Sequence, residues 1–170
     1  YLHQWRPESD YRLSYSARKK EGGGVLRDIS HELDYVIWIF GQWKKVSALG
    51  GHWSHLEIDS DDNFVLLMQT ENCHAMTLHL NYVDRVPKRE ILVNTDEGSI
   101  KIDLSRGELY QDLDVEKFEV NRDDTYRSQH KALLKGETDS LCSMEEGMNV
   151  LKLIEATEKS AKESIWVTRC

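Results

Sequence analysis

Apolar residues between Val25 and Phe40 recur mostly at intervals of three and four, which is the spacing of one helix face. This pattern predicts a helix over residues 25–40 that ends at Gly41, because glycine is common just after a helix C-terminus. The apolar stripe consists of Leu26, Ile29, Leu33, Val36, Ile37 and Phe40. The opposite side carries Asp28, His31 and Tyr35, flanked by Trp38 and Ile39. Because a solvent-facing side rarely carries such apolar bulk, we expect this second face to line a cleft or an interface.

From Lys45 to Val120 the apolar and polar residues alternate with a period of two, which predicts strands. The clearest strand covers residues 73–82, and a hairpin is predicted where residues 95–98, Thr-Asp-Glu-Gly, separate two further runs. The other strands are predicted at residues 45–53, 64–68, 89–94, 99–104, 108–111 and 115–120. Because parallel neighbours need crossovers of about a dozen residues, these closely spaced strands predict an antiparallel sheet.

Helical signals return near the end of the chain. Asp123 or Asp124 is suited to cap a helix that stops at Gly136, and Ser143 with Glu146 forms a capping box that opens a longer helix. The order helix, strands, helices predicts an α+β fold, with an open, mostly antiparallel sheet and helices packed on one face. The second face of the sheet also carries apolar residues, so a partner sheet in a dimer is one way to cover it.

Residues 1–21 interleave aromatic and basic side chains without any helical or strand period, and we expect a long ordered loop there. The following Gly22-Gly23-Gly24 does not match the G-x-G-x-x-G pattern of a nucleotide loop, and no strand is predicted before it. We therefore expect these glycines to form a tight entry into the helix, where the backbone approaches another chain segment or a ligand closely.

Composition and charge argue against several classes of protein. The 170 residues carry a formal net charge of −8, which argues against a nucleic-acid-binding protein. No apolar run approaches the roughly 20 residues that a membrane-spanning helix needs. The three widely spaced cysteines fit a reducing compartment, so we expect a cytoplasmic location and no disulfide framework. The length suits a single domain over residues 1–170.

Asp28 and His31 are the strongest candidate pair for chemistry. Three residues apart on one helix, a carboxylate and an imidazole are neighbours, so Asp28 could orient His31 for proton transfer. The alternative is an ordinary helix-start aspartate beside an exposed histidine. His52 and His55 precede an acidic cluster, but their odd spacing on a strand would point them to opposite faces, and we expect no metal site.

The segment from Gly22 to Asp34, Gly-Gly-Gly-Val-Leu-Arg-Asp-Ile-Ser-His-Glu-Leu-Asp, with the following Trp-Ile-Phe-Gly at residues 38–41, resembles the Gfo/Idh/MocA family of NAD(P)-dependent oxidoreductases. The upstream Trp-Arg-Pro at residues 5–7, the run at residues 10–16 and the last predicted helix are also similar to that family. The resemblance implies the C-terminal domain of such an enzyme, with a fold like the C-terminal domain of glyceraldehyde-3-phosphate dehydrogenase.

In that family an N-terminal Rossmann domain binds NAD or NADP, and the C-terminal domain binds a sugar or polyol and forms oligomers through its open sheet. The chain begins with Tyr1 and lacks the nucleotide-binding pattern, so we expect the Rossmann domain to be missing and this part alone to be inactive. The resemblance thus implies a sugar-like substrate, the missing domain and a second copy of the chain as partners, and neither nucleic acid nor membrane.

The family's catalytic spacing is D-x-x-x-H, whereas here Asp28-x-x-His31 is one residue shorter. The resemblance makes His31 the general acid or base, with Asp28 either its partner or a substrate contact. It also suggests substrate-binding residues, which are Trp5, Arg6, Tyr11, Arg12, Tyr15, Arg27, Tyr82 and Arg85. Two other functions remain open: a binding or dimerisation module without catalysis, and a metal-dependent hydrolase built on His52 and His55.

Overall fold

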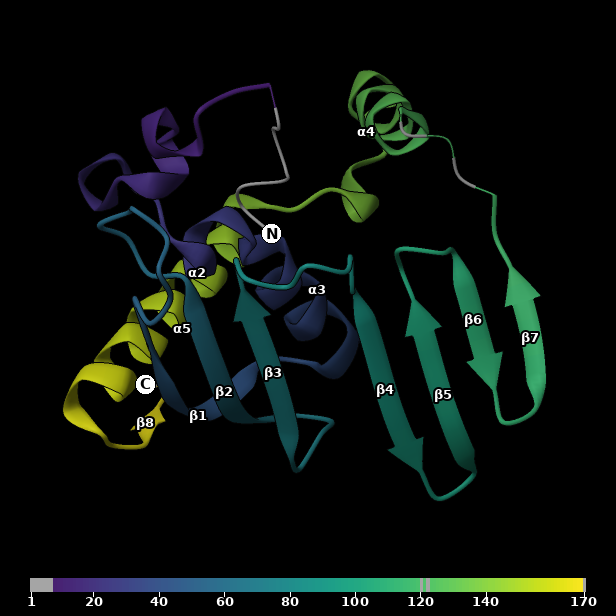
Figure 1. Ribbon diagram of the computed structural model, residues 1–170. Helices are drawn as coiled ribbons and strands as arrows, with labels where there is room; N and C mark the ends of the chain where they lie inside the picture. Colours follow the sequence, from purple (N-terminus) through teal and green to yellow (C-terminus); the bar gives the residue numbers. More distant parts are fainter. Residues whose placement is uncertain (1–7, 120, 122, 170) are drawn as a thin grey trace. The chain divides into compact units, whose positions relative to one another are not determined.

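The computed structural model describes residues 8–119, 121 and 123–169. The chain divides into two compact units, the first being Tyr1–Val83 with Ser143–Cys170 and the second Asp84–Cys142 (Figure 1). Two compact units can belong to one domain, so the single domain over residues 1–170 stays a prediction.

From Tyr11 to Glu21 the first unit forms short helical turns and not an irregular loop. Three 3-10 helices, η1 (Tyr11–Leu13), η2 (Tyr15–Ala17) and η3 (Lys19–Glu21), follow one another before the glycine segment. Asp10 caps η1, since its carboxylate accepts a hydrogen bond from the Arg12 backbone N–H at 3.0 Å. The predicted ordering of this aromatic-basic segment is confirmed for the part that the structure describes.

The prediction of one helix over residues 25–40 is wrong. The segment forms two helices, α2 (Val25–Asp28) and α3 (Ser30–Phe40), because Ile29 between them has non-helical dihedral angles of φ −111° and ψ 33°. The apolar stripe nevertheless faces the core, with Leu26 and Leu33 completely buried. Gly41 ends α3 in a positive-φ conformation, as predicted.

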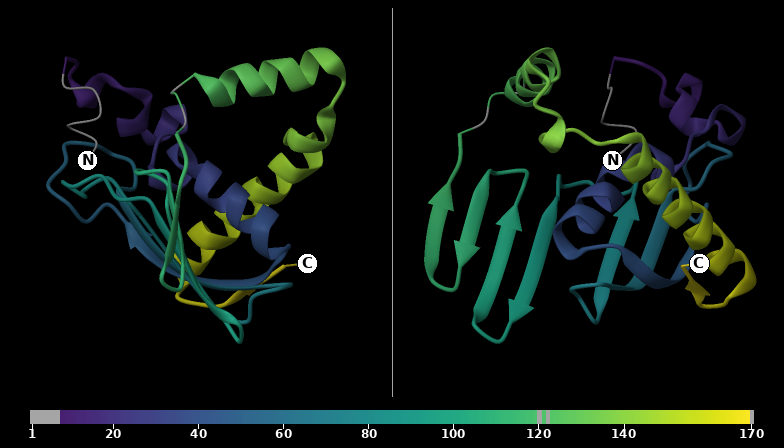
Figure 2. Two further views of the ribbon diagram at one scale, coloured as in Figure 1. Left: turned by 90° about the vertical axis from the view of Figure 1, so that its right-hand side faces the viewer. Right: turned by 180° about the vertical axis from the view of Figure 1, so that it is seen from behind.

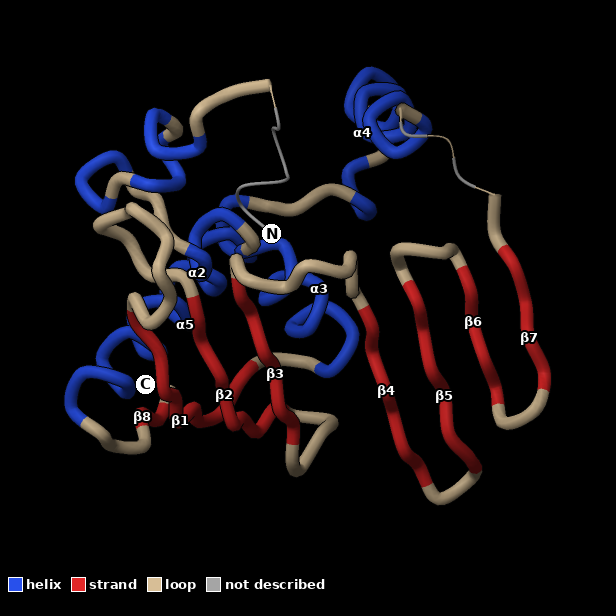
Figure 3. The backbone as a smooth tube through the Cα atoms, viewed as in Figure 1, coloured by secondary structure: helices blue, strands red, loops and turns tan. Residues whose placement is uncertain are grey.

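The first sheet has the strand order β3-β2-β1-β8, and all its pairs are antiparallel (Figure 3). Its strands are β1 (Trp43–Gly51), β2 (Asn63–Thr70), β3 (Met76–Asn81) and β8 (Val167–Thr168). Along β2 the residues alternate as a half-buried strand should: Leu66 and Met68 are fully buried, whereas Val65 and Leu67 are exposed. The sequence predicted a more buried strand here, because residues 64–68 are all apolar, and the exposure of Val65 and Leu67 differs from that expectation.

Helices cover one face of the first sheet. The long helix α5 (Met144–Glu163) packs on β1 and against α3, and both helices lie on the same side of the sheet (Figure 2). The predicted capping box is confirmed, since the Glu146 N–H donates to Ser143 Oγ at 3.2 Å and the Ser143 N–H to Glu146 Oε2 at 2.7 Å. Leu153 and Ile154 of α5 are buried in the core that this packing creates.

The second unit contains a four-stranded antiparallel sheet of order β4-β5-β6-β7. Its elements are β4 (Glu90–Thr95), β5 (Gly98–Asp103), β6 (Glu108–Gln111), β7 (Asp114–Lys117), α4 (Asp124–Lys135) and η4 (Thr138–Ser140). The predicted hairpin is confirmed, because Thr95 pairs with Gly98. The predicted last strand ends three residues early, at Lys117.

The α+β class and the antiparallel pairing are confirmed, although the strands form two sheets and not one. No helix within the described part of the chain has the length and apolar composition needed to cross a membrane.

Candidate functional site

The glycine segment holds the start of α2 against two other parts of the first unit. A Cβ atom added to Gly23 would lie 2.2 Å from the Tyr15 carbonyl oxygen, and one added to Gly24 would lie 2.4 Å from Asp61 Oδ1. Only glycine allows such close contacts. The predicted close approach of the backbone is therefore confirmed, and the neighbour is another segment of the chain itself.

Asp61 fixes the first turn of α2. Its backbone carbonyl accepts the Val25 N–H at 3.0 Å, and its Oδ2 atom accepts the Leu26 N–H at 3.3 Å. Burial is the main influence on this carboxyl group and raises its pKa above the usual value. Asp61 thus satisfies N–H groups that a helix start leaves without an intrahelical acceptor.

Asp28, at the end of α2, is bonded to Tyr82. The Tyr82 hydroxyl, at the end of β3, donates a hydrogen bond of 2.5 Å to Asp28 Oδ2. Tyr82 is buried, and this burial, followed by the hydrogen bond to Asp28, raises the pKa of the phenol well above its usual value. The phenol therefore stays neutral and remains a donor to the Asp28 carboxylate at physiological pH.

His31, in the first turn of α3, contacts a different carboxylate from the predicted one. Its Nε2 atom lies 3.0 Å from Oε1 of Glu32, whose side chain is only 10% exposed, whereas the His31 side chain is 56% exposed. The break at Ile29 explains the difference, because residues three apart are neighbours only on a continuous helix. The orienting role of Asp28 stays a prediction.

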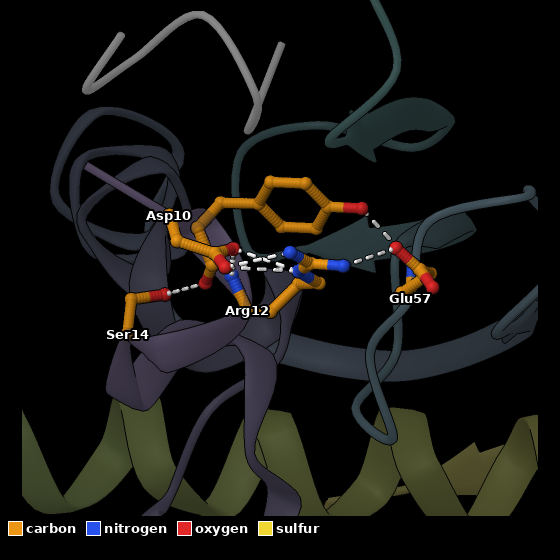
Figure 4. Close-up of polar contacts among 5 residues, drawn as sticks. Asp10, Arg12, Ser14 and Glu57 are labelled. Carbon is orange, nitrogen blue, oxygen red and sulfur yellow. Dashed lines mark hydrogen bonds and ion pairs between the residues drawn. The ribbon is translucent and has the colours of Figure 1, made fainter. Parts of the chain in front are cut away.

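The aromatic-basic segment is tied to the loop before β2. Arg12 bonds Asp10 through Nε and Nη2, both at 2.8 Å, and Glu57 through Nη1 at 2.9 Å (Figure 4). The hydrogen bonding that Arg12 donates to Asp10 is the largest cause that raises the pKa of the Arg12 guanidinium. The Tyr11 hydroxyl accepts the Glu57 N–H at 3.2 Å. Both predicted substrate-binding residues thus have protein partners.

The remaining predicted binding residues differ in their exposure, in their contacts and in the unit to which they belong. Tyr15 is exposed on η2, and Arg27 forms an ion pair of 3.0 Å with Glu158 of α5. Arg85 belongs to the second unit and has interactions of its own. Trp5 and Arg6 lie outside the described residues. Of the predicted site residues in the described part of the first unit, Asp28 and Tyr82 are joined by a direct contact, whereas His31 and Arg27 contact Glu32 and Glu158.

The loop containing His52 and His55 is organised by a buried aspartate. Asp62 accepts hydrogen bonds from the Trp53 and Ser54 backbone N–H groups at 2.9 and 3.0 Å. His52 Nε2 lies 2.9 Å from the Leu56 carbonyl oxygen. Among residues 8–119, 121 and 123–169, no three His, Cys, Asp or Glu side chains are grouped so that they could hold a metal ion.

Glu32 and Asp61 are site residues that the sequence analysis missed. A signal for Glu32 exists, because it lies one turn before Val36 at the edge of the apolar stripe, where an acidic residue needs a partner. Asp61 had no such signal, since its contact with α2 spans 35 positions of sequence.

Comparison with known proteins gives the family. A family model described as "Oxidoreductase family, C-terminal alpha/beta domain" (Gfo/Idh/MocA) matches residues 1–168. The 2,7-anhydro-N-acetylneuraminate hydratase of Escherichia coli (strain K12) is 30% identical over 97 residues, which are 55% of this chain and 26% of that protein.

Solved structures share the fold. A levoglucosan dehydrogenase in complex with NADH and levoglucosan superposes with a TM-score of 0.80 at 19% identity, covering 92% of this chain and 53% of that one. The WlbA dehydrogenase from Bordetella pertussis, in complex with NADH and UDP-GlcNAcA, gives a TM-score of 0.69 at 16% identity, covering 87% and 48%. The chain thus spans about half the length of these two enzymes. It belongs to the Gfo/Idh/MocA oxidoreductase family and corresponds to that family's C-terminal alpha/beta domain.

Proposed function

We propose that this chain is the substrate-binding and oligomerisation part of an NAD(P)-dependent oxidoreductase that acts on a hydroxyl or carbonyl group of a sugar, nucleotide sugar or polyol. The family match supports the class of enzyme. The structural relatives named above support the substrate class, because their structures are complexes with levoglucosan and UDP-GlcNAcA.

The cofactor of the complete protein is NAD or NADP, which this chain does not hold by itself. Its glycine segment does not fit a dinucleotide, because Tyr15, Ser16 and Asp61 already fill the space beside Gly23 and Gly24. We assign cofactor binding to an N-terminal Rossmann domain, in line with the NADH complexes of relatives about twice as long. When bound there, the nicotinamide supplies hydride chemistry.

His31 is the single residue on which the proposal depends. Its imidazole is more than half exposed, so it is accessible to a substrate, and it lies beside a carboxylate. In the oxidation direction the imidazole takes the proton of the substrate hydroxyl while the substrate carbon loses hydride, which leaves a carbonyl group. In the reverse direction the imidazolium returns that proton.

Substrate binding is assigned to Arg27 of α2 and to the aromatic-basic segment. Tyr15 and Arg27 offer an aromatic ring and a guanidinium group, which suit a sugar or a phosphate-bearing ligand. Tyr82 acts through Asp28, because its own hydroxyl is already used as a donor. Trp5, Arg6, Tyr11, Arg12 and Arg85 complete the proposed set.

The test is a substitution of His31 in the full-length protein. We expect His31→Ala to lower turnover of a sugar substrate by about 100-fold or more, the effect of losing a general acid or base, with little change in NAD(P) affinity. His55→Ala is the matched control, because His55 is an exposed histidine of the same unit, and it should leave turnover unchanged. Unchanged turnover in His31→Ala would contradict the proposal.

A second candidate function is a binding or dimerisation module without chemistry. The exposed aliphatic side chains of Leu49, Val65 and Leu67 on the first sheet favour it. Steady-state kinetics with wild-type full-length protein separates the two functions, since a module without chemistry shows no sugar-dependent reduction of NAD(P).

A further inference from the structure

We propose that Tyr82 is a positioning residue for substrate: it holds one carboxylate oxygen of Asp28 and leaves the other, Oδ1, to bind a sugar hydroxyl that does not react. This inference rests on the proposed sugar oxidoreductase function. It makes Asp28 a residue that selects the substrate and gives it no part in proton transfer.

The contact between the two side chains is a hydrogen bond from a buried donor to a half-buried acceptor. The Tyr82 hydroxyl donates to Asp28 Oδ2 at 2.5 Å, and Tyr82 is only 4% exposed. Burial is the main reason why the pKa of the phenol is raised, so Tyr82 keeps its proton at physiological pH. Since an ionised carboxylate only accepts, the phenol is a permanent donor to Oδ2.

Backbone hydrogen bonds hold both residues in place. The Tyr82 N–H donates to the carbonyl oxygen of Asp62 at 2.9 Å, and Asp62 is completely buried. The Asp28 N–H donates to the Gly24 carbonyl oxygen at 3.0 Å, in the turn that forms α2. The bond between the side chains therefore joins two fixed points and restricts the orientation of the Asp28 carboxylate.

The second oxygen of Asp28 is unused within the described part of the chain. There, Tyr82 is the sole hydrogen-bond partner of the Asp28 side chain, which forms no ion pair with a lysine or arginine. The neighbouring Arg27 is paired with Glu158 of α5 at 3.0 Å instead. A half-buried carboxylate with an unused oxygen is stabilised by a further donor, and a sugar hydroxyl is such a donor.

The surroundings of this oxygen suit a neutral sugar ring. A phosphate or carboxylate group would be repelled by the Asp28 charge, whereas a hydroxyl group can donate to it. Tyr15, whose side chain is 50% exposed, acts electrostatically on the Tyr82 phenol, so it lies near the pair. Its aromatic ring offers a surface on which a sugar can pack.

Substrate analogues test the inference in the wild-type protein. The full-length protein is given levoglucosan, unmodified hexoses and UDP-linked hexoses, and the sugar with the highest kcat/KM is compared with its monodeoxy analogues. We expect one analogue that keeps the reacting hydroxyl to have a kcat/KM about 10- to 100-fold lower, the effect of losing a hydrogen bond to a charged group. If every such analogue matches its parent, the inference is wrong, even if no variant folds.

Tyr82→Phe should weaken this discrimination. We expect KM for the parent sugar to rise about 3- to 10-fold, with kcat changed less than about threefold, and the disadvantage of the analogue to fall below about threefold. A merely structural role would lower the amount of folded protein and leave the discrimination between the two sugars unchanged.

Tyr110→Phe is the matched control. The Tyr110 hydroxyl also donates to a carboxylate at 2.5 Å, that of Glu108 in the second unit. Removing this second phenol should leave both KM and the discrimination between parent and analogue at their wild-type values.

The two proposals fail in different ways. If a sugar is oxidised and the reaction depends on His31, but Tyr82→Phe discriminates as the wild type does, Tyr82 has no positioning role and the proposed function stands. If none of the sugars reduces NAD(P), the proposed function fails and this inference fails with it.

Discussion

Tyr82 and Asp28 illustrate how a single contact changes the role of a residue. From its spacing, Asp28 was the natural partner of His31, yet it accepts a hydrogen bond from a buried phenol at the end of β3. The phenol is 54 positions away in sequence. Its burial and the nearby carboxylate both raise its pKa, because both disfavour the phenolate.

We predict that Tyr82→Phe lowers the free energy of unfolding by about 1–3 kcal/mol at pH 7, because Asp28 loses its donor.

The contribution of Tyr82 to the free energy of unfolding also depends on pH, and the pKa shift defines the sign of this dependence. In the unfolded chain Tyr82 ionises near pH 10, whereas in the folded chain its raised pKa keeps the proton, so the unfolded state binds fewer protons above pH 10. The stability that Tyr82 contributes is therefore complete below pH 10 and declines above it.

Urea unfolding between pH 9 and pH 11.5 measures this effect. The wild-type protein should lose up to about 1.4 kcal/mol more per pH unit above pH 10 than Tyr82→Phe does, which is the slope for one proton. Parallel curves for the two proteins would show that the phenol is not held neutral by the fold.

Short elements position the candidate site. The η1, η2 and η3 turns bring the Tyr15 and Ser16 carbonyl groups against Gly23, and this contact sets the direction in which α2 starts. The break at Ile29 then separates α2 from α3. Small backbone features therefore decide which side chains meet, although the apolar stripe continues across the break.

We predict opposite effects for alanine at two glycines. Gly23→Ala should lower the free energy of unfolding by about 1–3 kcal/mol, because its Cβ atom would overlap backbone carbonyl groups that cannot move aside easily. Gly147→Ala, in α5 with open space around it, should be neutral or stabilising by up to about 1 kcal/mol. Midpoints of urea unfolding compare them, and equal midpoints would rule out the tight packing at Gly23.

Within the described residues of the first unit, helices cover only one face of the first sheet. Leu49 pairs with Val65 across β1 and β2, and both side chains are exposed, as is Leu67. The helices α3 and α5 pack on the opposite face, where the alternating residues of β2 are buried. This face is the surface through which we propose that two copies associate.

If two copies associate through this face of the first sheet, charged side chains introduced on the face should prevent the association. We expect the full-length protein with Val65→Lys and Leu67→Lys to have half the molar mass of the wild type, or less, in size-exclusion chromatography with light scattering. Both side chains are about 40% exposed, so the monomer should tolerate lysine. Leu134→Lys, an exposed leucine on α4 of the second unit, is the control and should keep the wild-type mass. An unchanged mass in the double variant would place the contact elsewhere.

Local patterns in the sequence determined the element types, the antiparallel pairing, the capping box at Ser143 and the close approach at the glycines, because each depends on residues near one another in the chain. They also placed His31 on a helix, although they did not show the break at Ile29, after which the helix carrying His31 begins. Glu32 is adjacent to His31 in the sequence, so distance along the chain does not explain why it was missed. Asp28 was predicted as the partner because residues three apart are neighbours on a continuous helix.

Only the tertiary structure decided which donor meets which carboxylate. Tyr82 reaches Asp28 because β3 ends beside α2, and Asp61 caps α2 from the loop before β2. The division of the strands into two sheets has the same origin, because it depends on how distant segments pack. Periodicity reports which face of an element is buried, but it carries no information on the element that buries it.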